Sequence, residues 1–308
     1  MRIHLDTDFG GDTDDACALT MLLGWPGVEI TGVTTAADRT GLRAAYVHHV
    51  LSLVGRMDVV VASGAAASLT TQSVADPVMG DARHWPTDIV PRIAAPGAAL
   101  DLLASSIELG ATVVAIGPYT NLAMLEVARP GSLGCAPVVV MGGWIAPPED
   151  GLPAWGPEMD FNVQWDTRAA EIVVAHAADL TMVPLAPTLK AHLRSADVPL
   201  LRATGPLGEL LARQAEAHGA AYEMTAMGGA HVGLPDDLLN FQYDPVACAV
   251  ALGWEGAIAT EMWLQPAWEG AALRFQSDGE GQRIRVVTDL NGRAFAERWL
   301  QSVADAHS

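Results

Sequence analysis

The feature that most constrains the fold is the regular alternation of short apolar runs with helical patterns along the first 185 residues. Runs rich in Val and Ile have the length of β-strands and fall at residues 2–8, 28–35, 58–64, 111–117, 136–143 and 180–185. Helical patterns lie between them at 14–25, 41–55, 97–110, 118–128 and 166–177, with Pro118 in a first turn and Asp166 at a capping position. Continuously apolar strands predict a mainly parallel central sheet with helices on both faces. We therefore expect an α/β fold that forms one domain over residues 1–308.

The C-terminal part of the chain has a different pattern. Residues 272–278 and 282–290 both have strand character, and the letters GEGQ between them are typical of a turn. Two such runs with a short Gly-containing connection predict a β-hairpin. A last helix is expected at 292–305. The sequence thus predicts a small antiparallel piece near the C-terminus.

The composition excludes several classes of partner. The formal net charge is -19, so a nucleic-acid polymer or an anionic membrane would be repelled, whereas a neutral small molecule or a metal cation would not. No apolar run is long enough for a transmembrane helix, and the N-terminus lacks the pattern of a signal peptide. We expect a cytoplasmic protein in which Cys17, Cys135 and Cys248 are buried, reduced thiols.

A concentration of carboxylates follows the first expected strand. The stretch HLDTDFGGDTDDACAL carries Asp6, Asp8, Asp12, Asp14 and Asp15. In a parallel sheet, ligands bind beyond the carboxyl ends of the strands, so this stretch should share one edge with residues 34–39, 117–121 and 141–144. Helix capping accounts for one or two of these aspartates, but not for five. A hard cation that binds carboxylate oxygens accounts for the others, and the absence of His and Cys between Asp6 and Asp15 argues against zinc.

Two other kinds of protein also have closely spaced aspartates. An EF-hand loop counted from Asp6 would need a bidentate Glu at its twelfth position, where Cys17 stands, so this interpretation fails. A Mg²⁺-dependent phosphotransferase of the haloacid dehalogenase type also has D-x-D after its first strand. That mechanism has no use for the pair Asp14 and Asp15, but the phosphotransferase stays open as a less favoured alternative.

The whole pattern resembles the inosine-uridine preferring nucleoside hydrolase family. LDTDFGGDTDDACAL resembles the signature of this family, in which a strand ends in D-x-D and a helix opens with D-D-A. The segments GVTTAADRT, AIGPYTNLA, VVMGG, DFNVQWDTRAAEIV and QYDPVACAVAL resemble later blocks of the family in the same order. The resemblance implies a Rossmann-like nucleoside hydrolase fold, hydrolysis of the N-glycosidic bond of ribonucleosides, and assembly into homodimers or homotetramers.

The resemblance also implies a role for individual residues. Asp8, Asp15 and Asp244 would be carboxylate ligands of a Ca²⁺ ion, with the carbonyl of Thr120 as a further ligand and with water and ribose hydroxyls completing the shell. Asp8 would act as general base for the attacking water. Anionic groups near the sugar would stabilise an oxocarbenium-like transition state. The residues expected to hold the ribose are Asp14, Asp160 and Asn162, where Asp160 is one methylene shorter than the Glu of the family.

Two positions depart from the family pattern. Tyr243 stands where some members have a purine-activating His, and a phenol with an ordinary pKa near 10 is a poor acid at neutral pH. Arg39 stands where the family usually has Asn or Asp, and it could pair with Asp38 or Asp14 or receive an anionic group of the substrate. A modified ribosyl substrate, or a ribose-binding protein without catalysis, is therefore an alternative to ordinary nucleoside hydrolysis.

Aromatic stacking could assist departure of the base where Tyr243 does not. Trp85, Trp144 and Trp155 all fall in or near the loops of the expected edge. For each of them, packing in the core or in a loop is the competing interpretation. Trp144 directly follows the strand-end letters MGG and is our first choice for a stacking residue.

Overall fold

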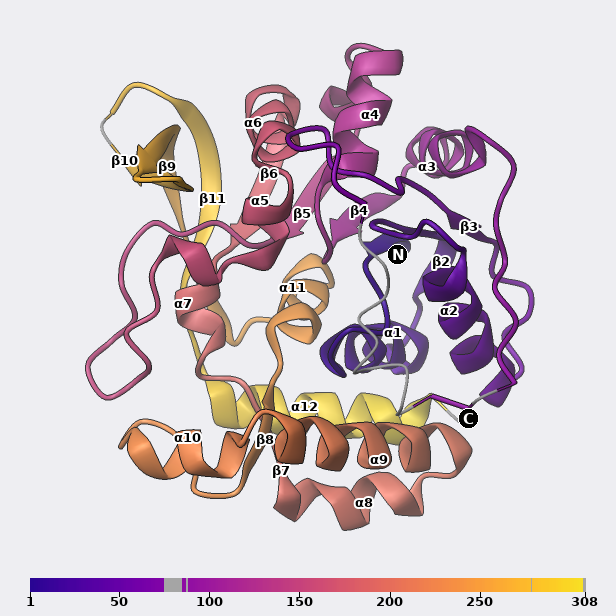
Figure 1. Cartoon of the computed structure of the whole chain (residues 1–308), viewed down its shortest axis with the longest axis vertical. Coiled ribbons are helices and arrows are strands. Elements are labelled where there is room, and N and C mark those ends of the chain that lie inside the picture. Colours follow the sequence, from indigo (N-terminus) through magenta and orange to yellow (C-terminus); the bar gives the residue numbers. More distant parts are fainter. Residues whose placement is uncertain (75–84, 87, 278, 307–308) are drawn as a thin grey trace.

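The computed structural model describes residues 1–74, 85–86, 88–277 and 279–306. Its central feature is a nine-stranded sheet in the order β10-β9-β11-β6-β5-β4-β1-β2-β3 (Figure 1). All pairs from β11 to β3 are parallel, and β9 pairs antiparallel with both β10 and β11. The strands are β1 (Arg2–Thr7), β2 (Glu29–Thr35), β3 (Val61–Ser63), β4 (Thr112–Ala115), β5 (Pro137–Met141), β6 (Asp179–Val183), β9 (Ala257–Glu269), β10 (Ala272–Ser277) and β11 (Gln282–Leu290).

Helices cover both faces of this sheet. They are α1 (Asp14–Gly24), α2 (Leu42–Leu53), α3 (Ala98–Glu108), α4 (Thr120–Ala128), α5 (Phe161–Trp165), α6 (Thr167–His176), α7 (Leu185–Thr188), α8 (Val198–Ala203), α9 (Pro206–Ala221), α10 (Met224–Ala230), α11 (Tyr243–Ala251) and α12 (Gly292–Asp305). A small antiparallel pair, β7 (His192–Arg194) and β8 (Leu238–Phe241), lies near α8 to α10 (Figure 1). The predicted α/β fold with a mainly parallel sheet is therefore confirmed.

The core is divided by the sheet into two apolar layers. Side chains of α3, α4 and α6 pack on one face with Val113, Ala115 and Val138. Side chains of α1, α2, α11 and α12 pack on the other face with Ile3 and Leu5 of β1. These layers bury both sides of each parallel strand, which explains why apolar residues predominate in the strands; His4, Asp6 and Thr34 are buried polar exceptions on β1 and β2.

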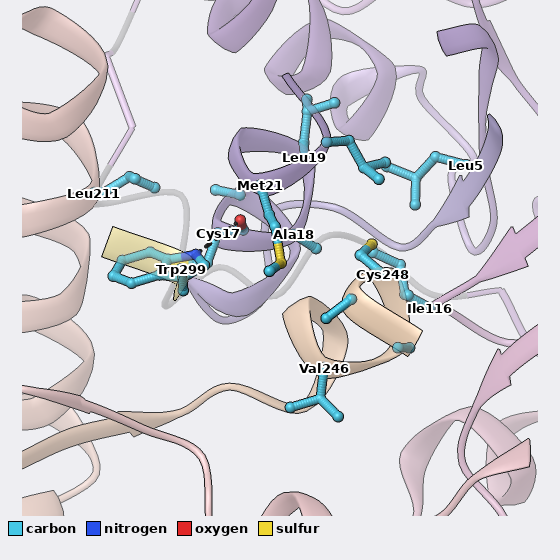
Figure 2. Close-up of a cluster of buried hydrophobic side chains, with 14 of the residues drawn as sticks. Leu5, Cys17, Ala18, Leu19, Met21, Ile116, Leu211, Val246, Cys248 and Trp299 are labelled. Carbon is cyan, nitrogen blue, oxygen red and sulfur yellow. Dashed lines mark hydrogen bonds between the residues drawn. The ribbon is translucent and has the colours of Figure 1, made fainter. Parts of the chain in front are cut away.

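Figure 2 shows the centre of the second layer, where α1, α11 and α12 meet. Cys17 and Met21 of α1 pack beside Cys248 of α11 and the fully buried indole of Trp299. The indole Nε1 of Trp299 donates a hydrogen bond of 3.1 Å to the carbonyl of Cys17, so its polar atom is satisfied inside the apolar layer. This packing fixes the start of α1 against the start of α11, and both of these helix ends carry aspartates.

The C-terminal antiparallel piece is present, but the predicted hairpin between 272–278 and 282–290 is wrong. Strands β10 and β11 do not pair with each other, because β9 lies between them. Leu264 of β9 faces Ser277 on one side and Gln282 on the other. The true hairpin joins β9 to β10 through Gly270. Strand β9 is exposed along most of its length, so it lacks the apolar pattern that would have predicted it.

Smaller differences concern one helix start and one thiol. Helix α4 begins at Thr120 rather than at Pro118. Cys135 is exposed, whereas Cys17 and Cys248 are buried free thiols as predicted. Among the described residues, no helix is both long and apolar enough to cross a membrane.

Candidate active site

Three carboxylates meet where the first turn of α1 approaches the first turn of α11. Asp14 and Asp15 begin α1, Asp244 lies in the first turn of α11, and ligand oxygens of the three side chains lie within 4.8 Å of one another. The backbone N–H of Asp244 also points to the carboxylate of Asp14 at 3.4 Å. All three residues are buried. Together with Asp8, which follows β1 on the same edge, they form what we call the aspartate cluster.

The electrostatics of the aspartate cluster are unfavourable without a cation. Burial raises the pKa of Asp14, Asp15 and Asp244 well above the usual range, and neighbouring aspartates raise it further. Like charges in a medium of low dielectric constant disfavour the ionised forms of one another. The donor set consists of carboxylate oxygens only, which suits a hard cation such as Ca²⁺. The residues present therefore fit a divalent cation.

Asp8 reaches this cluster from a turn that leaves little free space. An ideal Cβ built on Gly117 would lie 2.6 Å from the Asp8 nitrogen and 2.8 Å from its Oδ1, so only glycine fits between β4 and Asp8. Burial raises the pKa of Asp8, and the nearby guanidinium of Arg43 opposes that rise. The side chain is half-buried, in contrast to the other members of the cluster. Asp8 is thus the member of the cluster that is best placed to meet a solvent-derived water.

Asp12 is a turn-forming residue. Its Oδ1 accepts a hydrogen bond of 2.8 Å from the Asp14 nitrogen and another of 3.0 Å from Asn240 of β8. Burial alone would raise the pKa of Asp12. The hydrogen bonds from Asp14 and Asn240, together with the charge of His218, outweigh burial and lower this pKa. Asp12 therefore holds the start of α1 against β8.

Asp6 belongs to a second buried polar group that lies under the cluster. Its Oδ1 accepts hydrogen bonds from the Thr34 hydroxyl and, at 2.7 Å, from Asn121 Nδ2. The Thr34 hydroxyl also meets Nε2 of His4 at 3.0 Å, and Nδ1 of His4 meets the Ser106 hydroxyl at 2.9 Å. We call these five residues the strand network, because they tie β1 to β2, α3 and α4.

Asn121 fastens the turn after β4 to two further strands. Its Nδ2 donates to the carbonyl of Thr35 at 3.0 Å, and its Oδ1 accepts from the nitrogen of Ala65 at 2.8 Å. With its amide satisfied in this way, Asn121 orders the turn.

Thr120 and Asp166 connect the same turn to α6. The Thr120 hydroxyl donates to Oδ2 of the fully buried Asp166 at 2.7 Å. Asp166 also caps α6 through Ala169 and accepts from the nitrogens of Leu69 and Thr70. The side chain of Thr120 is therefore occupied by Asp166.

Asp160 and Asn162 lie together at the carboxyl ends of β4 and β5, and both are buried. Asp160 caps α5 by accepting from Val163 at 3.2 Å, and it also accepts from the nitrogen of Gly143. Burial raises its pKa to about 6. Asn162 donates to the carbonyls of Ile116 at 2.9 Å and Met141 at 3.2 Å. Both residues thus fix the backbone of this edge.

The candidate aromatic residues occupy different places. Trp85 is buried and stacks on Tyr46 with ring centroids 4.2 Å apart, which is core packing. Trp144 is half-buried after β5, and its Nε1 donates to the carbonyl of Trp155 at 3.1 Å. Tyr243 opens α11 directly before Asp244, where burial and the nearby Asp12 raise the pKa of its phenol well above the usual range. Tyr243 is therefore a very weak acid, as the sequence predicts.

The basic residue that contacts the Asp8 turn is Arg43, whereas the sequence pattern indicates Arg39 as the basic residue near the site. Arg39 is exposed, and Asp38 is buried and caps α2 by accepting from the nitrogens of Arg43 and Ala44. The guanidinium of Arg43 donates to the carbonyls of Asp8 and Phe9. A signal was available: Arg43 is spaced by four and seven residues from the buried Val47 and Val50, which places an arginine on the apolar face of a helix.

Comparison with known proteins identifies the class of protein that this fold and these carboxylates define. Residues 3–297 match the inosine-uridine preferring nucleoside hydrolase family, so the chain belongs to that family. It is accordingly a nucleoside hydrolase, an enzyme that hydrolyses the N-glycosidic bond of ribonucleosides. The family-level resemblance predicted from the sequence is confirmed.

Individual relatives agree over the full length. The chain is 31% identical to the pyrimidine-specific ribonucleoside hydrolase RihA of Salmonella typhimurium, with 96% of both chains covered. Its fold is similar to that of a purine-preferring ribonucleoside hydrolase from Gardnerella vaginalis, with a TM-score of 0.81, 22% identity and coverage of 100% and 99% of the two chains. It is also similar to an inosine-uridine preferring nucleoside hydrolase from Bacillus anthracis, with a TM-score of 0.73, 17% identity and coverage of 99% of each chain.

Proposed function

We propose that the chain is a Ca²⁺-dependent nucleoside hydrolase that releases a free base and ribose. The observation that carries the proposal is the buried meeting of Asp14, Asp15 and Asp244, three carboxylates that offer only oxygen ligands. By the family resemblance, Asp8, Asp15, Asp244 and the carbonyl of Thr120 would hold the ion, while Asp14, which lies beside Asp15 and Asp244, would face the ribose. When bound, Ca²⁺ supplies a positive charge that makes a nearby water more acidic.

Different residues of the chain would then have different roles in hydrolysis. Asp8 takes a proton from water as the water oxygen adds to the anomeric carbon, and the C–N bond breaks with its electron pair leaving on the base. Asp14, Asp160 and Asn162 hold the ribose, and the surrounding carboxylates stabilise the positive charge that develops on the sugar. This assignment is supported by the position of all four groups at the carboxyl edge of the sheet.

Pyrimidine ribonucleosides are the proposed substrate class. The 31% identity with a pyrimidine-specific relative supports this choice. The raised pKa of Tyr243 also supports it, because protonation of purine N7 would require an acid that this phenol cannot supply. Trp144 would contact the base, and Arg39, as an exposed cation on the loop after β2, would bind an anionic group if the substrate is modified. We further propose that the enzyme works in the cytoplasm as a homodimer or homotetramer, which light scattering would measure.

The test is base release from uridine, cytidine, inosine and adenosine, measured with and without a calcium chelator. We expect one calcium per chain by elemental analysis, loss of activity in the chelator, and recovery with Ca²⁺. Zinc in the protein, or turnover that the chelator does not affect, would refute the metal assignment. Turnover of p-nitrophenyl phosphate with Mg²⁺, in the absence of base release, would favour the phosphotransferase. Ribose binding measured by calorimetry without turnover would favour a binding protein.

A further inference from the structure

The Asp8 turn contains two adjacent glycines, so something outside it must hold it in place. Gly10 has φ of 103°, a conformation that glycine adopts freely, and nothing lies within 4 Å of the place that a Cβ on Gly11 would occupy. A general base must keep its carboxylate within hydrogen-bond reach of the water that it deprotonates. The segment from Asp8 to Gly11 would gain many conformations if it were anchored only by the end of β1.

The guanidinium of Arg43 provides such an anchor. Its Nη1 donates to the carbonyl of Asp8 and, at 3.1 Å, to the carbonyl of Phe9, while its Nε donates to the carbonyl of Ala37 at 3.1 Å. One planar group therefore joins the loop after β1 to the loop after β2. Among the described residues, Arg43 is the one arginine or lysine that is buried, with 2% of its surface exposed.

Helix α2 is itself held firmly against the sheet. Asp38 accepts hydrogen bonds from the backbone nitrogens of Arg43 and Ala44 at 3.3 and 3.0 Å, and from the hydroxyl of Thr35 at 2.8 Å. The ring of Tyr46, one turn after Arg43, packs so closely on Gly10 that an added Cβ there would lie 2.4 Å from the ring. The same helix thus contacts the turn through a guanidinium and through an aromatic ring.

We propose that Arg43 is the positioning residue of the general base: its guanidinium fork fixes the Asp8–Phe9 backbone so that the Asp8 carboxylate faces the other aspartates. The role rests on the proposed function, since it assumes that Asp8 is both a ligand and the base. The role depends on the planar shape of the guanidinium, because its Nη1 and Nε donate to the carbonyl oxygens of three residues, Asp8, Phe9 and Ala37. A lysine at this position keeps the charge but presents a single ammonium on a flexible stem, so it cannot reproduce the fork.

The experiment compares Arg43→Lys and Arg43→Met with the wild type, and uses Arg56→Met, three residues beyond the end of α2 and paired with the exposed Asp58, as a matched control. Three quantities are measured: kcat and KM for uridine, the affinity for Ca²⁺ by calorimetry, and Tm in chelator. We expect both Arg43 variants to lose at least thirtyfold in kcat and about tenfold in Ca²⁺ affinity, with KM within threefold of the wild type. The control should change none of these quantities.

Two results would overturn the proposal. If Arg43→Met keeps both kcat and Ca²⁺ affinity within threefold of the wild type, Arg43 does not position Asp8. If Arg43→Lys restores both quantities, the site needs the charge and not the fork. If Arg43→Met fails to fold, kcat and Ca²⁺ affinity of Arg43→Lys alone test the proposal, with values near those of the wild type counting against it. A wild type that binds Ca²⁺ and hydrolyses no nucleoside would refute the proposed function instead. The Ca²⁺ affinities of the variants would still test whether Arg43 positions Asp8.

Discussion

The aspartate cluster and the strand network are both buried and polar, yet they are built in opposite ways. In the strand network, Thr34 and Asn121 donate hydrogen bonds to Asp6, and His4 meets the Thr34 hydroxyl from the other side. In the aspartate cluster, Asp14, Asp15 and Asp244 mainly face one another. With one proton on the Asp6 carboxyl, whose pKa burial raises to about 7, the network is neutral and needs no ligand, whereas three facing carboxylates need several protons or a cation. The difference indicates that the strand network supports the fold, whereas the aspartate cluster binds a cation.

The largest effect is expected from a change in the cluster itself. Asp8→Asn should lower kcat by roughly 10² to 10⁴, because an amide can still bind a cation weakly but cannot accept the proton. The fold should persist, since Asp8 is half-buried and its backbone carbonyl remains available to Arg43. Steady-state kinetics with uridine and a circular dichroism spectrum measure the two effects, with exposed Asp58→Asn as control. Near-normal turnover would remove Asp8 from the role of base.

Removal of the cation should expose the charge repulsion of the cluster. The pKa values of Asp14, Asp15 and Asp244 are raised in the folded chain, so their contribution to stability is present below the unfolded pKa near 3.8 and is lost as pH rises. In chelator, Tm should therefore fall between pH 5 and pH 8. Ca²⁺ at about 1,000 times its Kd should restore about 4 kcal/mol at the higher pH. Equal Tm values at pH 8 with and without Ca²⁺ would contradict this expectation.

Within the strand network, His4 should contribute to the pH dependence with the opposite sign, whereas Asp6, whose pKa burial raises to about 7, contributes with the same sign as the cluster. Burial lowers the pKa of His4 from 6.5 to about 3, so its contribution to stability is present above pH 6.5 and is lost as pH falls. Between pH 6.5 and 4.5 the loss from His4 should be about 2–3 kcal/mol. His4→Gln cannot be protonated and lacks this loss, so its unfolding free energy should rise by about this amount relative to the wild type as pH falls over this range, as measured by urea titration. The exposed His176→Gln serves as control, and an unaltered slope in His4→Gln would show that His4 does not control this transition.

The smallest effects are expected where the base would bind. Tyr243→Phe should change kcat by less than about tenfold, because its phenol is too weak an acid to protonate the leaving base. Trp144→Ala should lower kcat/KM by a larger factor, since stacking adds about 0.5–1.5 kcal/mol beyond the burial of area. Kinetics on the best substrate compare the two variants. A hundredfold loss in Tyr243→Phe together with little loss in Trp144→Ala would reverse the two roles.

The sequence predicted the parts of this molecule that have a local pattern. The parallel strands are apolar on both faces, so their type and the sheet edge at which the aspartates meet could be inferred from residues 2–185. Strand β9 could not, because it is mostly exposed and contains Pro266, and its neighbours in the sheet are set by pairing over long distances. The contact between Arg43 and the Asp8 turn could not be predicted either, since a helical pattern does not say which loop the buried face of the helix will meet.

Gly117 has a consequence for how this enzyme can vary. An added methyl group would overlap the backbone nitrogen of Asp8, so even alanine at this position should displace the catalytic turn. In a library of all single substitutions selected for growth on a nucleoside, position 117 should therefore be almost invariant, although glycine contributes no chemistry of its own. Half-buried residues on the rim, such as Tyr243 and Trp144, should tolerate replacements with altered base preference. New specificities would then arise on the rim while the sheet edge beneath it stays fixed.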